Sequence, residues 1–410
     1  MVKTPQDTPW RRIRRLTPTL AAVLLAACAS ASRPRVSPLA VARAVRDSVQ
    51  GVLQRALADS AFPGAYAIVG SLENTYASVG VGHLDWAPSP KPDENTMWDL
   101  ASLTKVIGTT TAVMQLWEQG RIDLDAPVQR YLPEWKGPHK SEVTVRNLLT
   151  HTAGLPPFER YYLLNESPEQ TLRLFLGTPL DTVPGARMVY SDIGIILLGK
   201  IVEQIAGEPL DRYDTEHIFR PLGMTSTMYR PPASLLPRIA PTERDPWRGR
   251  LVRGEVHDEN AYALGGVSGH AGLFSSAHDL AIFARTMLAG GTWHGVTILH
   301  PATIDAFTHV QDPSLSNRAL GWEVPTGTNS AGHRLSSRAF GHTGFTGTSI
   351  WIDPERDLFI ILLTNRVDPT RENHKIGKVR VALADAAVAA LETLHATAAT
   401  TPSPIPGTTP

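Results

Sequence analysis

The chain has 410 residues, with 39 Lys and Arg against 39 Asp and Glu, and 42% of its residues are hydrophobic. This charge balance gives no reason to expect a nucleic-acid partner, and the hydrophobic content is ordinary for a globular protein. The length allows one large domain or two, each with a buried core. Because the chain holds 1 cysteine, it cannot form a disulfide within itself.

The N-terminal segment carries an export signal. A cluster of arginines over residues 11–15 precedes a short apolar run that ends at Cys28. Such a run is too short to span a membrane and is typical of a secretory signal peptide, and its last four residues are similar to a bacterial lipobox. We therefore expect residues 1–27 to be a lipoprotein signal peptide and Cys28 to carry the lipid that holds the exported chain on a membrane. Ala29 lacks the carboxylate that retains lipoproteins in an inner membrane, which favours the outer membrane, facing the periplasm. The cell surface is the alternative location.

The pattern along the mature chain predicts one domain. After a linker over residues 28–37, we expect this domain over residues 38–395 and a disordered tail rich in Thr, Pro and Ala over residues 396–410. Apolar residues at helical spacing predict helices over 41–57, 98–120, 145–151, 193–205, 278–288 and 379–394. Strands are expected over 64–70, 76–82, 348–352 and 358–363, and cleft-lining loops over 236–275. Strands at both ends with helices between them predict an α/β (α+β) fold, in which the terminal strands pair and enclose a helical insertion.

A serine and a lysine stand three residues apart at the start of the helix expected over 98–120. On a helix, Ser102 and Lys105 share one face, so the amine can reach the hydroxyl and help to activate it as a nucleophile. At the first turn, the positive end of the helix dipole favours a developing oxyanion. The alternative for Ser102 is an ordinary N-terminal helix cap.

Two further short motifs follow in order. Tyr190-Ser191-Asp192 precedes the apolar helix over 193–205, and His342-Thr343-Gly344 precedes the C-terminal strands. Taken alone, Tyr190 is more typical of a half-buried core tyrosine, and Thr343-Gly344 of a strand end. Together with Ser-x-x-Lys, however, the chain resembles the penicillin-recognising serine hydrolases, from about residue 41 to 394. It is most similar to their class C β-lactamase branch, which also contains D-alanyl-D-alanine carboxypeptidases and esterases.

The resemblance implies a fold and a set of roles. The fold is β-lactamase/transpeptidase-like, with an antiparallel sheet. Ser102 would be the acylated nucleophile, Lys105 its amine partner, and Tyr190 the general base or a proton relay. The backbone N–H groups of Ser102 and Phe345 would form the oxyanion hole. Substrate contacts would come from Asp192, His342, Thr343 and Gly344.

The sequence departs from the family pattern at two positions. Asp192 replaces the usual asparagine, so a carboxylate that only accepts hydrogen bonds replaces an amide. It could pair with Lys105 and hold it cationic, or disfavour an anionic substrate. His342 replaces the usual lysine, which weakens the β-lactamase interpretation. If the site binds a carboxylate, protonated His342 or an arginine such as Arg366 would have to supply the charge.

The histidines and carboxylates near residue 257 do not predict a metal site. Residues 257–259 read His-Asp-Glu, and His270 and His278 follow, but their spacing matches no zinc pattern. Roles in loops and cleft walls fit these residues better. We expect no metal and no cofactor.

The sequence thus predicts an exported, lipid-anchored monomeric serine hydrolase. Its expected partners are a membrane, through Cys28, and a small-molecule or peptidoglycan-peptide substrate. The expected reaction is that of a D-alanyl-D-alanine carboxypeptidase or an esterase, through an acyl-enzyme on Ser102. The alternatives are a class C-like β-lactamase and a non-catalytic protein that binds muropeptides or β-lactams.

Overall fold

The computed structural model describes residues 37–326 and 329–400. The expected signal peptide, Cys28 and nearly all of the linker lie outside this range. Within the described residues, no helix is both long enough and apolar enough to cross a membrane.

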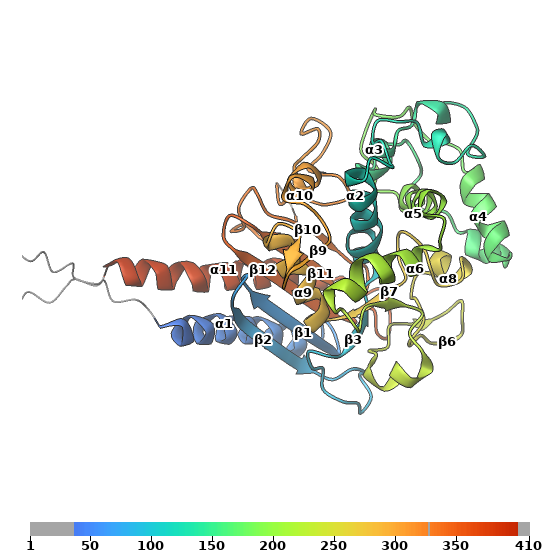
Figure 1. Cartoon of the computed structure of the whole chain (residues 1–410). Helices are drawn as coiled ribbons and strands as arrows, with labels where there is room; N and C mark the ends of the chain where they lie inside the picture. Colours follow the sequence, from blue (N-terminus) through green and yellow to red (C-terminus); the bar gives the residue numbers. More distant parts are fainter. Residues whose placement is uncertain (1–36, 327–328, 401–410) are drawn as a thin grey trace, which may run out of the picture.

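The fold is organised around a five-stranded sheet with the strand order β10-β11-β12-β1-β2 (Figure 1). All neighbouring strands in it are antiparallel. The strands are β1 (Gly64–Gly70), β2 (Thr75–Gly82), β10 (Phe340–Thr343), β11 (Ser349–Asp353) and β12 (Leu358–Thr364). β1 and β12 pair from Ala65 opposite Thr364 to Gly70 opposite Phe359. The expected antiparallel sheet of N- and C-terminal strands is therefore confirmed.

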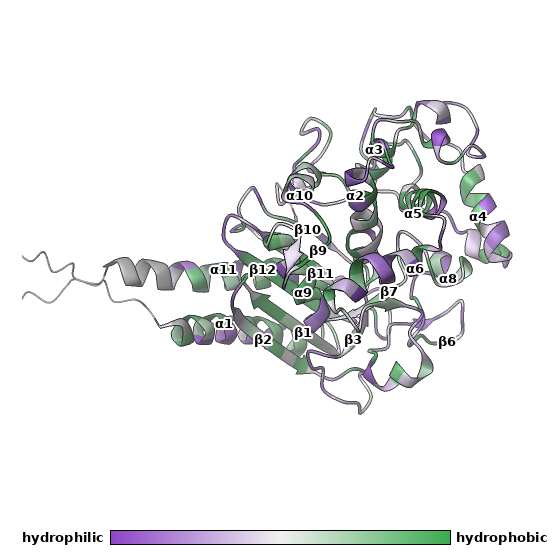
Figure 2. Ribbon diagram, viewed as in Figure 1, coloured by the Kyte–Doolittle hydropathy of each residue, from purple (hydrophilic) through white to green (hydrophobic). Residues whose placement is uncertain are grey.

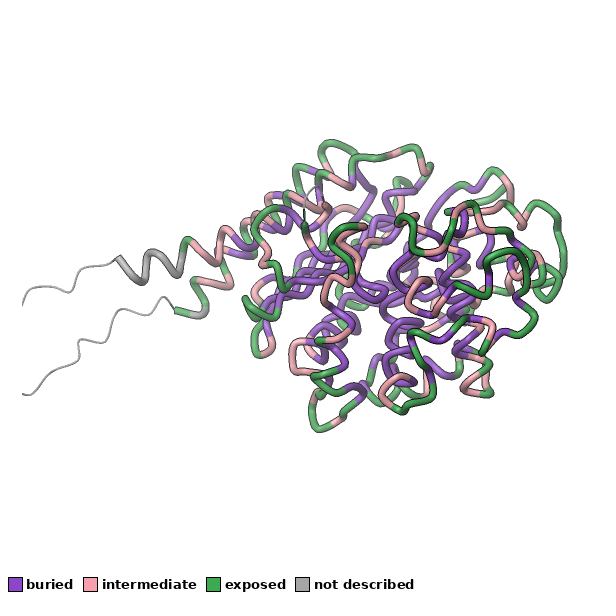
Figure 3. Tube along the Cα trace, turned by 90° about the horizontal axis from the view of Figure 1, so that it is seen from above, coloured by how far each residue is buried: buried purple, intermediate pink, exposed green. Residues whose placement is uncertain are grey.

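Two helices cover one face of the sheet. α1 (Pro38–Ala58) and α11 (Ile376–Thr400) lie side by side (Figure 1). Side chains alternate between the two faces along each strand, so Ala65, Ala67 and Val69 of β1 meet these helices, and Ile68 faces the other way. β1, β11 and β12 are accordingly buried along their whole length, and the sheet is largely green in Figure 2 and largely purple in Figure 3.

The last helix is longer than expected. α11 continues to Thr400, so it covers the first part of the segment that the sequence predicted to be a disordered tail from residue 396. Alanine has the highest helix propensity, and the run that follows Leu394 is rich in it, which accounts for the difference. Residues 401–410 lie outside the described residues.

Helices and short strands form the other half of the domain. The helices are α2 (Thr111–Glu118), α3 (Val145–Leu149), α4 (Pro168–Gly177), α5 (Asp192–Ala206), α6 (Leu210–Asp214), α7 (Arg220–Leu222), α8 (Glu259–Ala263), α9 (Ala277–Leu288) and α10 (Pro301–Thr308). β3 (Met97–Asp99), β7 (Leu273–Ser276) and β4 (Met228–Tyr229) form a second sheet. Two small hairpins are β5 (Arg244–Asp245) with β6 (Arg250–Leu251), and β8 (Thr292–Trp293) with β9 (Val296–Thr297).

The prediction of a single helix over residues 98–120 is wrong for the first part of that range. Trp98 and Asp99 belong to β3, a 3₁₀ turn spans Ala101–Leu103, and a π-helix over Lys105–Thr110 leads into α2. The periodicity of a short apolar run does not separate a buried strand from a helix. β3 forms because residues 97–99 pair with β7, which lies far along the sequence.

Candidate active site

Ser102 lies in a tight turn that a buried carboxylate holds in place. Asp99 Oδ1 accepts a hydrogen bond from the Ala101 N–H at 2.8 Å, and its Oδ2 accepts one from the His257 N–H at 2.6 Å. Ala101 has φ 46°, a left-handed conformation that is uncommon for a residue other than glycine. Burial raises the pKa of Asp99, and the two N–H groups work against this effect. Sequence reasoning missed Asp99, because its partner at His257 is distant in the chain.

The Ser-x-x-Lys pair meets at hydrogen-bond distance. Lys105 Nζ donates to Ser102 Oγ at 2.8 Å and to the His270 carbonyl at 3.1 Å. The same ammonium lies 2.8 Å from Asp192 Oδ1, in an ion pair whose lysine is buried and whose carboxylate is 20% exposed. Asp192 is the first residue of α5, so the second motif reaches the nucleophile through this lysine.

Asp192 decides the charge of Lys105. Burial is the largest single influence and lowers the pKa of Lys105, but the charges and hydrogen bonds of Asp192 and Tyr190 outweigh it. The net effect raises the pKa of Lys105 above its ordinary value. Lys105 is therefore an ammonium group that donates to Ser102, which makes it a poor acceptor for the serine's proton.

Tyr190 lies beside the same ammonium. Lys105 Nζ is 5.1 Å from the centroid of the Tyr190 ring. The following residue, Ser191, caps α5 through its side chain and also donates to the Pro156 carbonyl at 2.6 Å. Its N–H donates to His151 Nδ1 at 3.1 Å. These contacts fix the backbone that carries Tyr190, and the first two motifs come together as the resemblance implies.

A cavity of about 340 Å³ opens on Ser102. Its wall includes Ser102, Tyr190, Asp192 and Phe345, four residues singled out from the sequence. The remaining wall residues are Ala101, Phe158, His257, Asp258, Glu259, His270, Ala271 and Arg371. Five of these lie between residues 257 and 271, within the segment expected to form cleft-lining loops.

Phe345 holds an exposed position in this wall. Its side chain is 47% exposed, and its ring stacks on the His257 ring with centroids 5.7 Å apart. Arg366 holds Phe345 in place. The Nε of Arg366 donates to the Phe345 carbonyl at 2.9 Å, and its guanidinium lies 4.5 Å from the centroid of the Phe345 ring. Among the described residues, no acceptor binds the Phe345 N–H, as an oxyanion donor requires.

The third motif does not present its histidine to the cavity. His342 is 2% exposed, and its Nδ1–H donates to the Thr343 carbonyl at 2.8 Å. Burial lowers the pKa of His342 well below its ordinary value, and the positive charges of Arg318 and Lys105 lower it further. His342 is thus neutral. It cannot serve as the charged partner of a substrate carboxylate that the sequence allowed.

The other two residues of the third motif are also absent from the wall of the cavity. Thr343 is half-buried and Gly344 is buried, and neither lines the cavity. A Cβ at Gly344 would lie 2.4 Å from the Leu100 carbonyl oxygen, so this glycine permits the close approach of β10 to the nucleophile turn. The motif therefore shapes the site through its backbone.

The histidine and carboxylates of the wall are already paired. Asp192, Asp258 and His270 offer ligand atoms within 4.8 Å of one another. His270 Nε2 is 2.9 Å from Asp258 Oδ1, and its Nδ1 is 2.9 Å from Ser268 Oγ. Burial acts to raise the pKa of Asp258, but His270 overrides it and holds that pKa well below its usual range. With Lys105 on Asp192, each member of this cluster has a partner within the protein.

Arg371 was not anticipated from the sequence. Its Nη2 is 2.6 Å from Glu243 and 2.7 Å from Glu259, and Glu243 also lies 2.8 Å from His257 Nε2. Burial acts to raise the pKa of Glu243, but the hydrogen bonds of His257 and Arg371 lower it to about 2. Arg371 is thus a wall cation that two carboxylates already neutralise. No local sequence motif marks Arg371 as a residue of the site.

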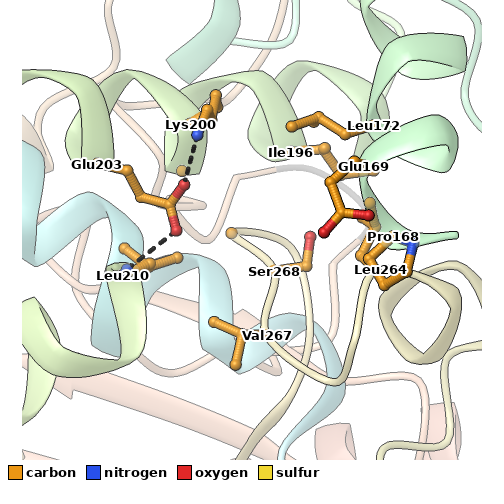
Figure 4. Close-up of a pocket in the computed structure, with 12 residues that line it drawn as sticks. Pro168, Glu169, Leu172, Ile196, Lys200, Glu203, Leu210, Leu264, Val267 and Ser268 are labelled. Atoms are coloured by element: carbon orange, nitrogen blue, oxygen red, sulfur yellow. Dashed lines mark hydrogen bonds and ion pairs between the residues drawn. The ribbon is translucent and has the colours of Figure 1, made fainter. Parts of the chain in front are cut away.

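A second, smaller cavity of about 180 Å³ lies between α4, α5 and the loop over residues 264–269 (Figure 4). Lys200 and Glu203 pair at 3.1 Å in its wall, and Glu203 also accepts the Leu210 N–H. Ser268 takes part in this wall while it binds His270. None of the motif residues lines this cavity.

Comparison with known proteins identifies the family. The model of the family described as Beta-lactamase matches residues 49–384. The chain belongs to the Beta-lactamase family. Among its relatives, a Salmonella agona protein named "Putative D-alanyl-D-alanine carboxypeptidase" is 37% identical over 313 residues, which cover 69% of this chain and 72% of the relative.

Solved structures share the fold of this Beta-lactamase family member. A penicillin-binding protein homologue from Caulobacter crescentus superposes with a TM-score of 0.70 at 21% identity, covering 87% of this chain and 98% of the other. EstCE1, described as a hydrolase with promiscuous acyltransferase activity, gives 0.69 at 23% identity, covering 85% and 99%. These likenesses establish the β-lactamase/transpeptidase-like fold that the sequence predicted.

Proposed function

We propose that this Beta-lactamase family member is a serine hydrolase that works through an acyl-enzyme on Ser102. The observation that carries the proposal is the contact of 2.8 Å between Ser102 Oγ and Lys105 Nζ at the wall of a cavity that Tyr190 also lines. A serine hydroxyl becomes an effective nucleophile when neighbouring groups accept its proton and stabilise its charge.

In the mechanism we propose, each group has one role. Ser102 Oγ attacks the substrate carbonyl, and its proton passes to Tyr190, which later protonates the leaving group. Lys105 stays cationic through Asp192 and stabilises the negative charge that develops on Ser102 and Tyr190. The N–H groups of Ser102 and Phe345 receive the oxyanion, a contribution of about 3 kcal/mol for each such donor. Water then hydrolyses the acyl-enzyme with Tyr190 as the base.

The first substrate class is a peptide that ends in D-alanyl-D-alanine. The relatives support it, since their printed name is that of a carboxypeptidase acting on this linkage. The second class is a small neutral ester, supported by the buried, neutral His342 and by the two carboxylates on Arg371. Because two carboxylates already neutralise Arg371 in the cavity wall, the site favours substrates without a carboxylate.

Export and lipid attachment are proposed from the N-terminal sequence. Cys28 is the single cysteine of the chain, and it ends a lipobox-like segment. The start of α1 lies at the end of the molecule opposite α5 and α8, so a tether there would leave the cavity open to the periplasm (Figure 1). Expressed with its leader, the protein should enter the detergent phase, and Cys28→Ser should release it. A soluble wild-type chain whose N-terminus is not residue 28 contradicts this proposal.

Intact-mass measurements test the hydrolase. The wild type and Ser102→Ala would each be mixed with a p-nitrophenyl ester, benzylpenicillin and a D-Ala-D-Ala peptide. We expect an acyl adduct on the wild type and none on the variant, together with turnover of the peptide or the ester. Rapid turnover of penicillin or nitrocefin would indicate a β-lactamase. A stable adduct without turnover of any substrate would indicate a binding protein, and turnover retained by Ser102→Ala would end the proposal.

A further inference from the structure

An arginine from outside the three motifs lies against the aromatic ring of Tyr190. Arg318 Cζ is 5.1 Å from the centroid of that ring, the same distance as Lys105 Nζ. Neither the Ser-x-x-Lys pair nor the two later motifs contain it. Tyr190 therefore lies within reach of two cations, of which the family motifs account for one.

The chain positions Arg318 through a small hairpin with fixed ends. Arg318 and Glu323 form an antiparallel bridge, and Glu323 bridges in turn to Gly341 of β10, next to His342. Between them, the Gly321 N–H donates to the Leu149 carbonyl of α3 at 2.9 Å, two residues before His151. The hairpin is thus attached both to the strand of His342 and to the helix end that leads into His151.

Other titratable groups surround the same ring. His151 lies at 4.5 Å and His342 at 5.9 Å between ring centroids, while Asp192 acts through Lys105. Burial lowers the pKa of both histidines well below the ordinary value, and the charge of Arg318 lowers them further. Both histidines are therefore neutral, and the cations that contact the Tyr190 ring among the described residues are Lys105 and Arg318.

The guanidinium of Arg318 is poorly compensated by other groups. Its side chain is 11% exposed, and its nearest carboxylate, on Glu323, is 3.7 Å away. Its Nε and Nη1 have no hydrogen-bond partner among the described residues. A buried cation with unsatisfied donors is costly unless a negative charge forms beside it. A phenolate formed on Tyr190 during the reaction would be such a charge.

We propose that Arg318 is a positioning residue that stabilises the phenolate form of Tyr190 and so makes this tyrosine the base of the reaction. It supplies the second positive charge that the buried, neutral His342 cannot provide. The inference rests on the proposed serine hydrolase, since it assigns a function to Tyr190 within that mechanism. No atom of Arg318 needs to touch the substrate, because Arg318 acts through the ring.

The test is the pH dependence of acylation in Arg318 variants. The kcat/KM for a p-nitrophenyl ester would be measured from pH 5 to 10 in the wild type, Arg318→Met and Arg318→Lys. Removing the cation destabilises the phenolate, so the acidic limb of the Arg318→Met profile should move to higher pH. On the acidic side of the profile, we expect kcat/KM of Arg318→Met to be about tenfold to a hundredfold lower than that of the wild type. This is the effect expected from removing one unit charge a few ångströms from the phenolate. The alkaline plateau should stay close to that of the wild type, and Arg318→Lys should lie between the two.

Arg285→Met is the matched control. Arg285 also places its guanidinium 5.1 Å from an aromatic ring, that of Phe359 on β12, and it does not contact the cavity. Its profile should keep the wild-type acidic limb. If Arg318→Met fails to fold, Arg318→Ala with added methylguanidinium replaces it, and the added cation should restore the rate on the acidic side.

Three outcomes overturn the proposal. An unshifted acidic limb in a folded Arg318→Met protein contradicts it, and so does a loss of equal size at every pH, which would indicate a structural role. Absence of rescue by methylguanidinium in a folded Arg318→Ala protein also contradicts it. The intact mass of the wild-type protein after reaction with the ester shows whether Ser102 is acylated. This measurement separates the proposed role of Arg318 from the proposed hydrolase. If the adduct forms, failure concerns Arg318 alone, whereas absence of the adduct overturns the hydrolase and this inference together.

Discussion

Lys105 and Asp192 form an ion pair at the wall of the reactive cavity, with 2.8 Å between Nζ and Oδ1. The carboxylate stands where the family pattern has asparagine, so the departure noted in the sequence has a structural consequence. It holds Lys105 in the cationic form against the effect of burial. In the proposed mechanism, the lysine therefore stabilises negative charge in the site, and Tyr190 accepts the proton.

Asp192→Asn should lower the pKa of Lys105, because the largest opposing influence, burial, then dominates. Since the raised pKa keeps the ammonium charged as the pH rises, its fall should move the alkaline limb of the acylation profile to lower pH. The measurement is kcat/KM for a neutral ester between pH 6 and 11. Glu203→Gln, which breaks the 3.1 Å pair with Lys200 elsewhere on α5, is the matched control. An alkaline limb that stays in place in Asp192→Asn would contradict the assignment.

Asp99→Ala should damage both stability and catalysis. The change leaves the buried N–H groups of Ala101 and His257 without their acceptor, a cost of about 1–3 kcal/mol for each group. Because Ala101 holds a left-handed conformation next to Ser102, the nucleophile turn should relax. Urea unfolding and the burst of p-nitrophenol would report the two effects. A burst of wild-type rate in a destabilised protein would show that Asp99 supports the fold without positioning Ser102.

His342 should give no pH-dependent preference for anionic substrates. Its pKa lies well below 6.5 and it is buried, so it stays neutral across the working range. The KM values of a D-Ala-D-Ala peptide and of a neutral ester should therefore follow parallel curves with pH. His342→Lys should lower stability rather than improve peptide binding, since it buries an ammonium close to Arg318 and Lys105. Tighter binding of the peptide alone at low pH would restore His342 as its partner.

Asp368 should make the free energy of unfolding depend on pH. Burial, with a contribution from Asp85, raises the pKa of this carboxyl from 3.8 to about 7 in the fold. Between these values the folded state holds a proton that the unfolded state releases, so stability falls as the pH rises toward 7 and above. Asp368→Asn should remove this loss, gaining about 1–2 kcal/mol at pH 8 after allowance for solvent screening. Urea unfolding at pH 5 and pH 8 checks it, with exposed Asp47→Asn as control. An equal gain at both pH values would contradict the titration.

Much of the architecture could be predicted from the sequence because local pattern carries it. The strands Gly64–Gly70 and Leu358–Thr364 are apolar runs between turn residues, and both appear where expected. The helix ending at Gly207 has a run of apolar residues followed by a left-handed glycine. By contrast, β3 and β7 are short, and each exists only because the other pairs with it.

The sequence by itself was enough to predict the candidate site, since Ser102, Lys105, Tyr190 and Asp192 stand in short motifs that can be recognised without the rest of the chain. The tertiary structure alone decided what surrounds them. Burial made His342 neutral, and distant segments brought Asp99, Arg371 and Arg318 to the site. The physical reason is that burial and charge compensation depend on which distant segments pack together, and no local spacing records that.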